Sequence, residues 1–469
     1  MRAVRRPFVL VAAVAVLVLG ITLSPAGGTT APAAAATVIT PSAPIKHVVI
    51  LYQENHTFDN VLGALCVADN RCDGATTAKL ANGSTYTLTQ ATDAIPNVAH
   101  STKAQQTAID NGKMDRFEKN SGCTPSQSYR CLSQFAPSQI PNLAALARQY
   151  VISDRTFQMD RVLSWGAHLE LVTTDLDGFT GDIPTQVSYA PKVNGVGTWG
   201  CNSGKVTGWK PTPASATQMV PPCVPNPDGT GTFWDTYGPN GSPQTSPVAN
   251  VPTILDSLNN AGRTWKMYVT QKGFDICSYV AKCHSSTQQT TNVVPTPSLL
   301  TDASAGKLPD LSIVLPSGNK QNTSQHNATS MAVGDNWIGQ AVNALLQGPE
   351  ANSTVVFITY DDCGCFYDHV PPPNAQLGLR VPMVIVSPWA KPGYTDSTVT
   401  SFIAMMTFTE HLFGLPALTA ADANSYDYSD SFDFSGATTT STFRAQTTSI
   451  SPSEQQQLSA NPPDPDDPT

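Results

Sequence analysis

Two predicted strands of this chain end in pairs of side chains that carry oxygen ligands. The apolar run IKHVVILYQEN ends at Glu54 and Asn55, and the run TVVFITYDD ends at Asp361 and Asp362. Ligands bind at the carboxyl ends of strands in open parallel sheets, so the two pairs are predicted to meet there. Carboxylates with an amide oxygen suit a hard divalent cation, which also relieves the repulsion between adjacent aspartates. The alternative is that both pairs are solvated turns.

The second pair lies in TYDDCGCFYDHVPPP, where Cys363 and Cys365 flank a glycine. The chain has ten cysteines, and an even number in an exported chain indicates disulfides. Proximity in sequence favours four local bridges: Cys66–Cys72, Cys123–Cys131, Cys201–Cys223 and Cys277–Cys283. For Cys363 and Cys365 a strained disulfide is favoured over a thiolate that joins the metal, and both alternatives stay open. No C-x-x-C pair occurs in the sequence, which argues against a zinc ribbon.

Residues 1–36 are predicted to be an export signal peptide. Arg2, Arg5 and Arg6 precede an apolar run, and an alanine-rich stretch with small residues for cleavage ends near Ala36. The Arg5-Arg6 pair also suggests twin-arginine export. A single membrane anchor is the alternative, but the apolar run is short and no basic stop-transfer segment follows it. The sequence therefore predicts a secreted, extracellular protein.

Short apolar runs and helical patterns alternate through the middle of the chain. Continuous apolar runs suit strands buried on both faces. Besides the two strands above, such runs lie at 150–156, 310–316 and 381–387. Helical patterns, some with start or stop signals, lie at 141–149, 252–261, 331–347 and 401–413. This alternation predicts an α/β fold, with a mostly parallel sheet and helices on both faces.

Residues 180–250 are rich in Gly, Pro, Ser and Thr and are predicted to form a loop-rich insertion, or cap, over the site. They carry Trp199, Trp209 and Trp234, which could enter a lipid headgroup layer and give peripheral membrane contact. The alternative is that these tryptophans pack the cap. Residues 417–469 are predicted to be a C-terminal extension, with roughly the last 20 residues disordered.

Composition narrows the class of protein further. The formal net charge is −9 and the pI about 5.3, so no global basic field recruits nucleic acid. Hydrophobic residues make up 40% of the chain and charged residues 13%, which argues against wholesale disorder. The oligomeric state cannot be deduced from these patterns.

Two longer segments resemble the signature motifs of the bacterial phosphoesterase family. They are ENHTFDNVLG and YDDCGCFYDHVPPP, and the usual family forms are ENRSFDxxxG and YDExGGFYDHVPPP. Five further segments look like family segments in family order: NGKMDRF, TILDSLNNAGRTWKMY, SQHN, RVPMVIVSPWAKPG and FTEHLFGLP. The resemblance covers roughly residues 45–416, taken as one catalytic domain. That family contains secreted phospholipases C and acid phosphatases and belongs to the alkaline phosphatase superfamily.

The resemblance implies an alkaline-phosphatase-like α/β fold built around a metal-assisted nucleophile. By position in the motifs, a divalent metal ion of unknown identity would be held by Glu54, Asn55, Asp361 and Asp362. Ser164, in VLSWGAHLEL, takes the position of the family's Ser or Thr nucleophile. The alternative is that this serine only caps a helix.

Four histidines are candidates for hydrogen bonds to phosphate and for protonating the leaving alkoxide. His168 follows Ser164 by four residues, so both lie on one face if a helix starts at Ser164. Such a helix would also point backbone N–H groups at a phosphate. The other candidates are His100, which precedes NGKMDRF, His326 in SQHN, and His369 in the second signature. Each could instead be a hydrogen-bonded structural histidine.

The implied activity is hydrolysis of a phosphate ester or phospholipid, of the phospholipase C or acid phosphatase type, through a phosphoseryl intermediate. The chain departs from the family pattern, with His56 for arginine, Asp362 for glutamate and Cys365 for glycine. These departures motivate a second hypothesis, a non-catalytic secreted binding protein on a decayed scaffold. A sulfatase is disfavoured because no C-x-P-x-R segment is present for a formylglycine nucleophile.

Overall fold

The computed structural model describes residues 38–186, 199–201, 203–229, 247–270, 274–284, 286–317, 322–436, 438 and 441–460. The predicted signal peptide at 1–36 and Trp234 lie outside these residues. Among the helices of the described ranges, none has the length and apolarity needed to cross a membrane.

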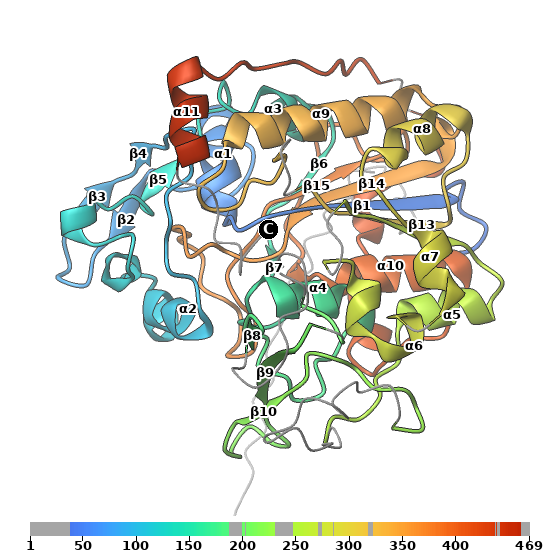
Figure 1. Cartoon of the computed structure of the whole chain (residues 1–469). Coiled ribbons are helices and arrows are strands. Elements are labelled where there is room, and N and C mark those ends of the chain that lie inside the picture. Colours follow the sequence, from blue (N-terminus) through green and yellow to red (C-terminus); the bar gives the residue numbers. More distant parts are fainter. Residues whose placement is uncertain are drawn as a thin grey trace, which may run out of the picture. The chain divides into compact units, whose positions relative to one another are not determined.

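An eight-stranded sheet ordered β12-β11-β13-β1-β14-β15-β6-β16 runs through the fold (Figure 1). The strands are β1 His47–Gln53, β6 Val151–Ser153, β11 Trp265–Tyr268, β12 Val293–Val294, β13 Leu311–Val314, β14 Thr354–Tyr360, β15 Met383–Val386 and β16 Thr395–Asp396. Neighbours pair in parallel, except that β15 is antiparallel to both β14 and β6. The prediction of a mostly parallel α/β sheet is confirmed.

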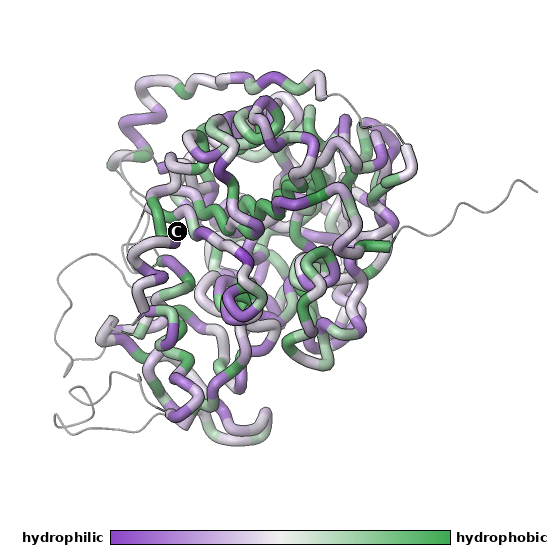
Figure 2. Tube along the Cα trace, turned by 90° about the vertical axis from the view of Figure 1, so that its right-hand side faces the viewer, coloured by the Kyte–Doolittle hydropathy of each residue, from purple (hydrophilic) through white to green (hydrophobic). Residues whose placement is uncertain are grey.

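The two strands that precede the oxygen-bearing pairs lie side by side in this sheet. β1 and β14 are rich in β-branched and aromatic residues, and every residue of β14 is buried. Figure 2 shows hydrophobic stretches, in green, running through the interior of the trace. Gln53 pairs with Tyr360 in the last register position of the two strands. The chain therefore leaves the sheet at Glu54 and at Asp361 on the same edge.

Helices cover both faces of the sheet. α3 Pro141–Gln149 and α9 Met331–Gln347 lie on one face, and α4 Ser164–Thr173 and α10 Ile403–Phe413 lie on the other (Figure 1). Together with α5 Ile254–Asn260 they match the helices predicted from sequence, and α4 begins at Ser164 as its spacing to His168 requires. The remaining α-helices are α1 Ala64–Asp69, α2 Thr102–Ile109, α6 Ala281–His284, α7 Thr287–Asn292, α8 Ser298–Ala305 and α11 Pro452–Ala460.

Smaller sheets lie outside the central one. β8 Thr185–Gln186, β9 Lys205–Trp209 and β10 Gln218–Val220 form an antiparallel sheet within the predicted cap. Three two-stranded pairs are β2 Thr77–Lys79 with β3 Thr85–Thr87, β4 Thr89–Gln90 with β5 Ser133–Gln134, and β7 Thr156–Phe157 with β17 Thr400–Ser401.

The cap buries its described tryptophans. Trp199 is 0% exposed and packs edge-on against Phe274, with ring centroids 4.7 Å apart. Trp209 is 8% exposed, and its indole N–H donates to the carbonyl of Asp177. Trp199 and Trp209 therefore pack the protein interior, which corrects the hypothesis that they enter a headgroup layer.

Four disulfides join the cysteine pairs that sequence proximity favours, Cys66–Cys72, Cys123–Cys131, Cys201–Cys223 and Cys277–Cys283. The predicted disulfide between Cys363 and Cys365 is wrong for this structure, because both are free thiols with their Sγ atoms 3.6 Å apart.

The prediction that roughly the last 20 residues are disordered is corrected in part, because α11 is helical within that stretch. Residues 461–469 lie outside the described residues.

Candidate active site

The oxygen-bearing pairs that follow β1 and β14 meet at the edge of the sheet. The backbone N–H of Asp361 donates to the carbonyl of Gln53 at 3.0 Å, which extends the ladder by one step. The backbone N–H of Asn55 then donates to Asp361 Oδ1 at 2.9 Å, across more than 300 residues of sequence. Asn55 adopts a left-handed conformation, with φ of 54°, and turns the chain back over the strand end. Glu54, Asn55, Asp361 and Asp362 are all 0% exposed.

The turn after β14 fixes the orientation of Asp362. The N–H of Gly364 donates to Asp362 Oδ1 at 2.7 Å, and the N–H of Asp362 donates to Asp361 Oδ1 at 2.6 Å. Gly364 has a φ of 50°, and a Cβ there would clash with the carbonyl oxygen of Asn55. Only glycine fits this position without displacing the Asn55 backbone.

Ser164, the first residue of α4, faces this group of oxygens. Its Oγ lies 3.3 Å from Asp362 Oδ2, 3.4 Å from Asn55 Oδ1 and 3.5 Å from Glu54 Oε2. The Tyr52 hydroxyl donates to the carbonyl of Ala167 at 3.1 Å and so ties α4 to β1. Leu163 precedes the helix, and no side chain in the described part of the chain caps its first turn. The backbone N–H groups there can therefore receive an anion beside the serine.

His168 lies one helical turn after Ser164 and is fully buried. Its Nε2 lies 3.5 Å from Glu54 Oε1 and 4.0 Å from Asp361 Oδ2. Ligand atoms of Glu54, His168 and Asp361 lie within 4.8 Å of one another, close enough to share one metal ion. The sequence predicts His168 only as a basic group near the nucleophile, so its proximity to two carboxylates adds a candidate ligand.

His100 and His326 lie on the opposite side of the Asn55 amide. The Asn55 nitrogen is 3.2 Å from Nε2 of each ring. Nδ1 of His100 faces the carbonyl of Val98 at 2.8 Å, and Nδ1 of His326 faces that of Asn327 at 3.1 Å. Each neutral ring therefore carries its proton on Nδ1 and accepts at Nε2, so the Asn55 amide donates one N–H to each histidine.

This arrangement leaves the Asn55 amide oxygen among carboxylates, 2.8 Å from Glu54 Oε2 and 3.0 Å from Asp361 Oδ1. Without a cation, exchanging the amide oxygen and nitrogen would satisfy the carboxylates, but both histidines would then have to donate from Nε2 as well. A cation at this position favours the orientation in which the amide oxygen faces the carboxylates. The donor set of Glu54, Asn55, Asp361 and Asp362 thus fits a divalent metal ion.

The electrostatics of the carboxylates support the same conclusion. Burial, together with the charge of Glu54, raises the pKa of Asp361 to about 8 in the protein alone, although His168 opposes the shift. Three buried carboxylates within reach of each other are costly unless positive charge compensates them. A bound divalent cation supplies that charge.

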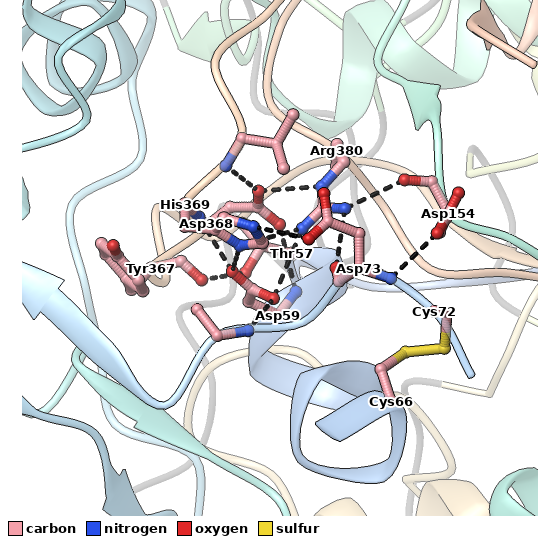
Figure 3. Close-up of polar contacts among 12 residues, drawn as sticks. Thr57, Asp59, Cys66, Cys72, Asp73, Asp154, Tyr367, Asp368, His369 and Arg380 are labelled. Carbon is pink, nitrogen blue, oxygen red and sulfur yellow. Dashed lines mark hydrogen bonds and ion pairs between the residues drawn. A yellow bond between two sulfur atoms is a disulfide. The ribbon is translucent and has the colours of Figure 1, made fainter. Parts of the chain in front are cut away.

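His369 is the one predicted site residue that the structure holds in a different network. Its Nδ1 lies 2.5 Å from Asp59 Oδ2, and its Nε2 lies 3.0 Å from Asp73 Oδ1 (Figure 3). Its backbone N–H also donates to Asp59 at 2.8 Å. Both ring nitrogens are therefore engaged by carboxylates, and the geometry favours a structural role for this histidine.

Arg380 is the centre of this second network and is fully buried (Figure 3). It pairs with Asp368 at 2.9 Å and with Asp59 at 3.3 Å, and donates to the carbonyls of Asp73 and Asp154. Asp59 belongs to the first signature and Asp368 to the second, so the network joins the segments that carry the two ligand pairs. Oxygen and nitrogen atoms of Asp59, Asp368 and His369 also lie within 4.8 Å of one another, but Arg380 already neutralises this group.

Two residues of the site escaped the sequence analysis. Tyr52 positions α4. It lies two residues before Glu54, and side chains two residues apart on a strand point to the same face, so the sequence could have placed it beside the site. Asn327 has its side-chain nitrogen 3.5 Å from His100 Nδ1, and it follows His326 directly in the SQHN segment.

The chain is similar to proteins of known families. The profile of the Phosphoesterase family matches residues 45–416. Non-specific phospholipase C6 of Arabidopsis thaliana is 25% identical over 390 residues, which cover 75% of this chain and 63% of that protein. Non-hemolytic phospholipase C of Pseudomonas aeruginosa is 22% identical over 441 residues, covering 79% of this chain and 54% of that protein. The chain thus spans less than two thirds of either relative.

Among solved structures, a protein in the alkaline phosphatase superfamily from Vibrio parahaemolyticus aligns with 84% of this chain and 71% of its own. The TM-score is 0.38 and the sequence identity 13%.

Proposed function

The chain belongs to the phosphoesterase family, and from this premise we propose that it hydrolyses phosphoric esters with the help of a divalent metal ion. The observation that carries the proposal is the convergence on Ser164 Oγ of oxygens from Glu54, Asn55 and Asp362, all within 3.5 Å. These oxygens come from two strand ends and face the first residue of a helix, which is where a phosphate can be received.

Glu54, Asn55, Asp361 and Asp362 would hold the metal ion, with His168 as a further candidate ligand. When bound there, the ion would lower the pKa of the Ser164 hydroxyl and stabilise negative charge on a phosphoryl oxygen. Asp362 keeps its orientation through the Gly364 N–H, so its shorter side chain, relative to the usual glutamate, still reaches Ser164.

Ser164 is the proposed nucleophile. Its attack on phosphorus would give a phosphoseryl intermediate, which water hydrolyses in a second step. The uncapped N–H groups of the first turn of α4 would receive the non-bridging oxygens. The fixed position of α4 against Tyr52 keeps the hydroxyl aimed at the incoming phosphate.

His100 and His326 orient the Asn55 amide and are the proposed donors to the substrate phosphate or the leaving alkoxide. Both are close to fully buried, at 7% and 2% exposed. To donate from Nε2, each ring must gain a proton there and release the Asn55 N–H that it accepts, because Nδ1 already faces a carbonyl. His369 has no part in this scheme.

The relatives' names favour phospholipids as the substrate class, so a phospholipase C activity is proposed ahead of a phosphomonoesterase. The export signal predicted at 1–36 supports action outside the cell, where a lipid surface is accessible. The alternative of a non-catalytic binding protein loses support, because the proposed ligands and the proposed nucleophile lie together despite the departures from the family motifs.

The test uses the purified protein with a chromogenic phosphomonoester, a chromogenic phosphodiester and phospholipid vesicles, with and without chelator. We expect turnover that chelator removes and that Ser164→Ala abolishes, while the exposed Ser304→Ala serves as the matched control. The split among the three substrates identifies the leaving group. A folded protein that turns over none of them with any divalent metal would refute the proposal.

A further inference from the structure

Two buried thiols lie beside the proposed metal site and have no part in the proposed reaction. Cys363 and Cys365 are both 0% exposed, and their Sγ atoms are 3.6 Å apart. The other eight cysteines form four disulfides. The chain thus holds one dithiol directly after Asp362.

The turn between the thiols is the one that orients Asp362. The N–H of Cys365 donates to Cys363 Sγ at 3.1 Å, and the N–H of Gly364 donates to Asp362 Oδ1 at 2.7 Å. Gly364 and Cys365 both have left-handed backbones, with φ of 50° and 48°. The carbonyl of Asn55 occupies the space next to Gly364, so the turn cannot move in that direction. A change in the distance between the sulfurs must therefore be absorbed on the Asp362 side.

We propose that Cys363 and Cys365 form a thiol–disulfide exchange site for low-molecular-weight disulfides, and that its oxidation weakens the metal site. The consequence for the metal rests on the proposed function. An S–S bond is about 2.05 Å long, so the two sulfurs must approach by roughly 1.5 Å. This movement pulls on the Gly364 N–H that holds Asp362, and one ligand leaves its position.

The exchange is balanced by two thiol–disulfide steps. One cysteine thiolate attacks the small disulfide, forms a mixed disulfide and releases one small thiolate. The second cysteine then attacks the protein sulfur of that mixed disulfide, closes the Cys363–Cys365 bond and releases the second small thiolate. The two protons lost by the cysteines end on the two released thiols.

Burial makes the exchange depend on metal occupancy. Neither sulfur is reachable while the turn is closed, so attack requires the turn to open. A cation on Glu54, Asn55, Asp361 and Asp362 stabilises the closed turn and so protects the thiols. Thermodynamic linkage then couples the two equilibria. If the bound cation makes the disulfide less stable by a given factor, the disulfide weakens cation binding by the same factor.

The experiment uses the full-length protein, stripped of metal and incubated with oxidised glutathione. Thiols are counted in denaturant without reductant, and Mn²⁺ binding is measured by titration calorimetry before and after oxidation. We expect the loss of two thiols per chain and Mn²⁺ affinity about tenfold or more weaker after oxidation. In a buffer of reduced and oxidised glutathione, saturating Mn²⁺ should raise the equilibrium ratio of dithiol to disulfide by the same factor. Peptide mapping should place the new disulfide between Cys363 and Cys365.

Cys363→Ser and Cys365→Ala, made singly, separate this proposal from direct ligation by a thiolate. Each variant should bind Mn²⁺ like the reduced wild type and lose the sensitivity to oxidised glutathione. Loss of Mn²⁺ binding in both variants, or an oxidised wild type with unchanged affinity, overturns the proposal. If the reduced wild type binds no Mn²⁺ while the disulfide forms, the link to the metal site is refuted, and the proposed metal-dependent function loses its support separately.

Discussion

The side-chain nitrogen of Asn55 lies 3.2 Å from Nε2 of His100. With Nδ1 of that ring on the carbonyl of Val98 and a cation in the proposed site, the Asn55 amide donates to the histidine and its oxygen faces Glu54 and Asp361. Without the cation, exchanging the amide oxygen and nitrogen satisfies the carboxylates instead. With the cation bound, one amide group therefore has its acceptor side in the proposed metal site and its donor side on the histidines. The orientation of the Asn55 amide in the proposed metal site and the protonation of the histidine therefore depend on each other.

His100→Gln and His326→Gln should reduce turnover far more than metal binding. General acid catalysis contributes about 10²–10⁴-fold, and kcat should fall within that range. Loss of one hydrogen bond to Asn55 is worth about 1 kcal/mol, so metal affinity should fall only about fivefold. Steady-state kinetics and metal titration check the two values. His47→Gln, at the far end of β1, is the control and should change neither. Equal losses of affinity and kcat would contradict the assignment.

Metal binding should strengthen as the pH rises toward 8. Burial and the charge of Glu54 raise the pKa of Asp361 to about 8 in the metal-free protein, so this carboxyl is protonated at lower pH. A cation must displace that proton, and the apparent affinity therefore increases with pH up to about 8 and levels off above it. Calorimetry in buffers of different ionisation enthalpy should detect proton release at pH 6.5 and little at pH 9. Binding without proton release at pH 6.5 would be inconsistent with this account.

Gly364→Ala should destabilise the protein more than a left-handed backbone alone explains. Gly83 offers the matched control, since its φ is 83° and nothing lies within 4 Å of a Cβ built there. Both substitutions cost about 1–2 kcal/mol for the left-handed conformation. At Gly364 the clash with the Asn55 carbonyl adds about 1–3 kcal/mol and weakens metal binding. Denaturant unfolding of the two variants measures the difference in their free energies of unfolding. Equal losses would show that the turn at Gly364 accommodates a Cβ at no extra cost.

Arg380→Met should lower the free energy of unfolding by about 3–5 kcal/mol, because it leaves Asp59 and Asp368 buried without their cation. Arg263→Met is the control, since Arg263 pairs with Asp310 at the surface and should cost about 0–1 kcal/mol. Chemical denaturation measures both variants. A similar small loss in each would mean that the buried network contributes little to joining the two signature segments.

Sequence patterns predicted the parts of the fold that depend on local chemistry. Apolar runs gave β1, β14 and β15, and the spacing of Ser164 and His168 matched a helix that begins at the serine. Strands β11, β12 and β16 escaped because no continuous apolar run marks them: β11 is WKMY, β12 is only two valines and β16 is TD. The order of the strands depends on packing between distant segments, which no single run encodes.

The four proposed ligands and Ser164 converge as the motif resemblance implied, since the motifs mark the ends of neighbouring strands. His369 differs because the motif does not reveal that Asp59 and Asp73 engage both of its ring nitrogens. The Cys363–Cys365 disulfide was wrong for a local reason, as Gly364 takes a turn that holds the sulfurs apart. The cap tryptophans show that composition identifies an insertion but not which of its faces is buried.

The most direct test of the central claim is to trap the phosphoryl group on Ser164. The protein is mixed with a phosphate ester substrate, quenched in acid and digested, and the peptide that contains Ser164 is examined by mass spectrometry. The account predicts phosphate on Ser164 in the metal-loaded wild type, none after chelation, and a loss of turnover in Ser164→Ala of at least about 10³-fold with metal content unchanged. Full turnover by Ser164→Ala, or turnover that survives removal of the metal, would contradict it.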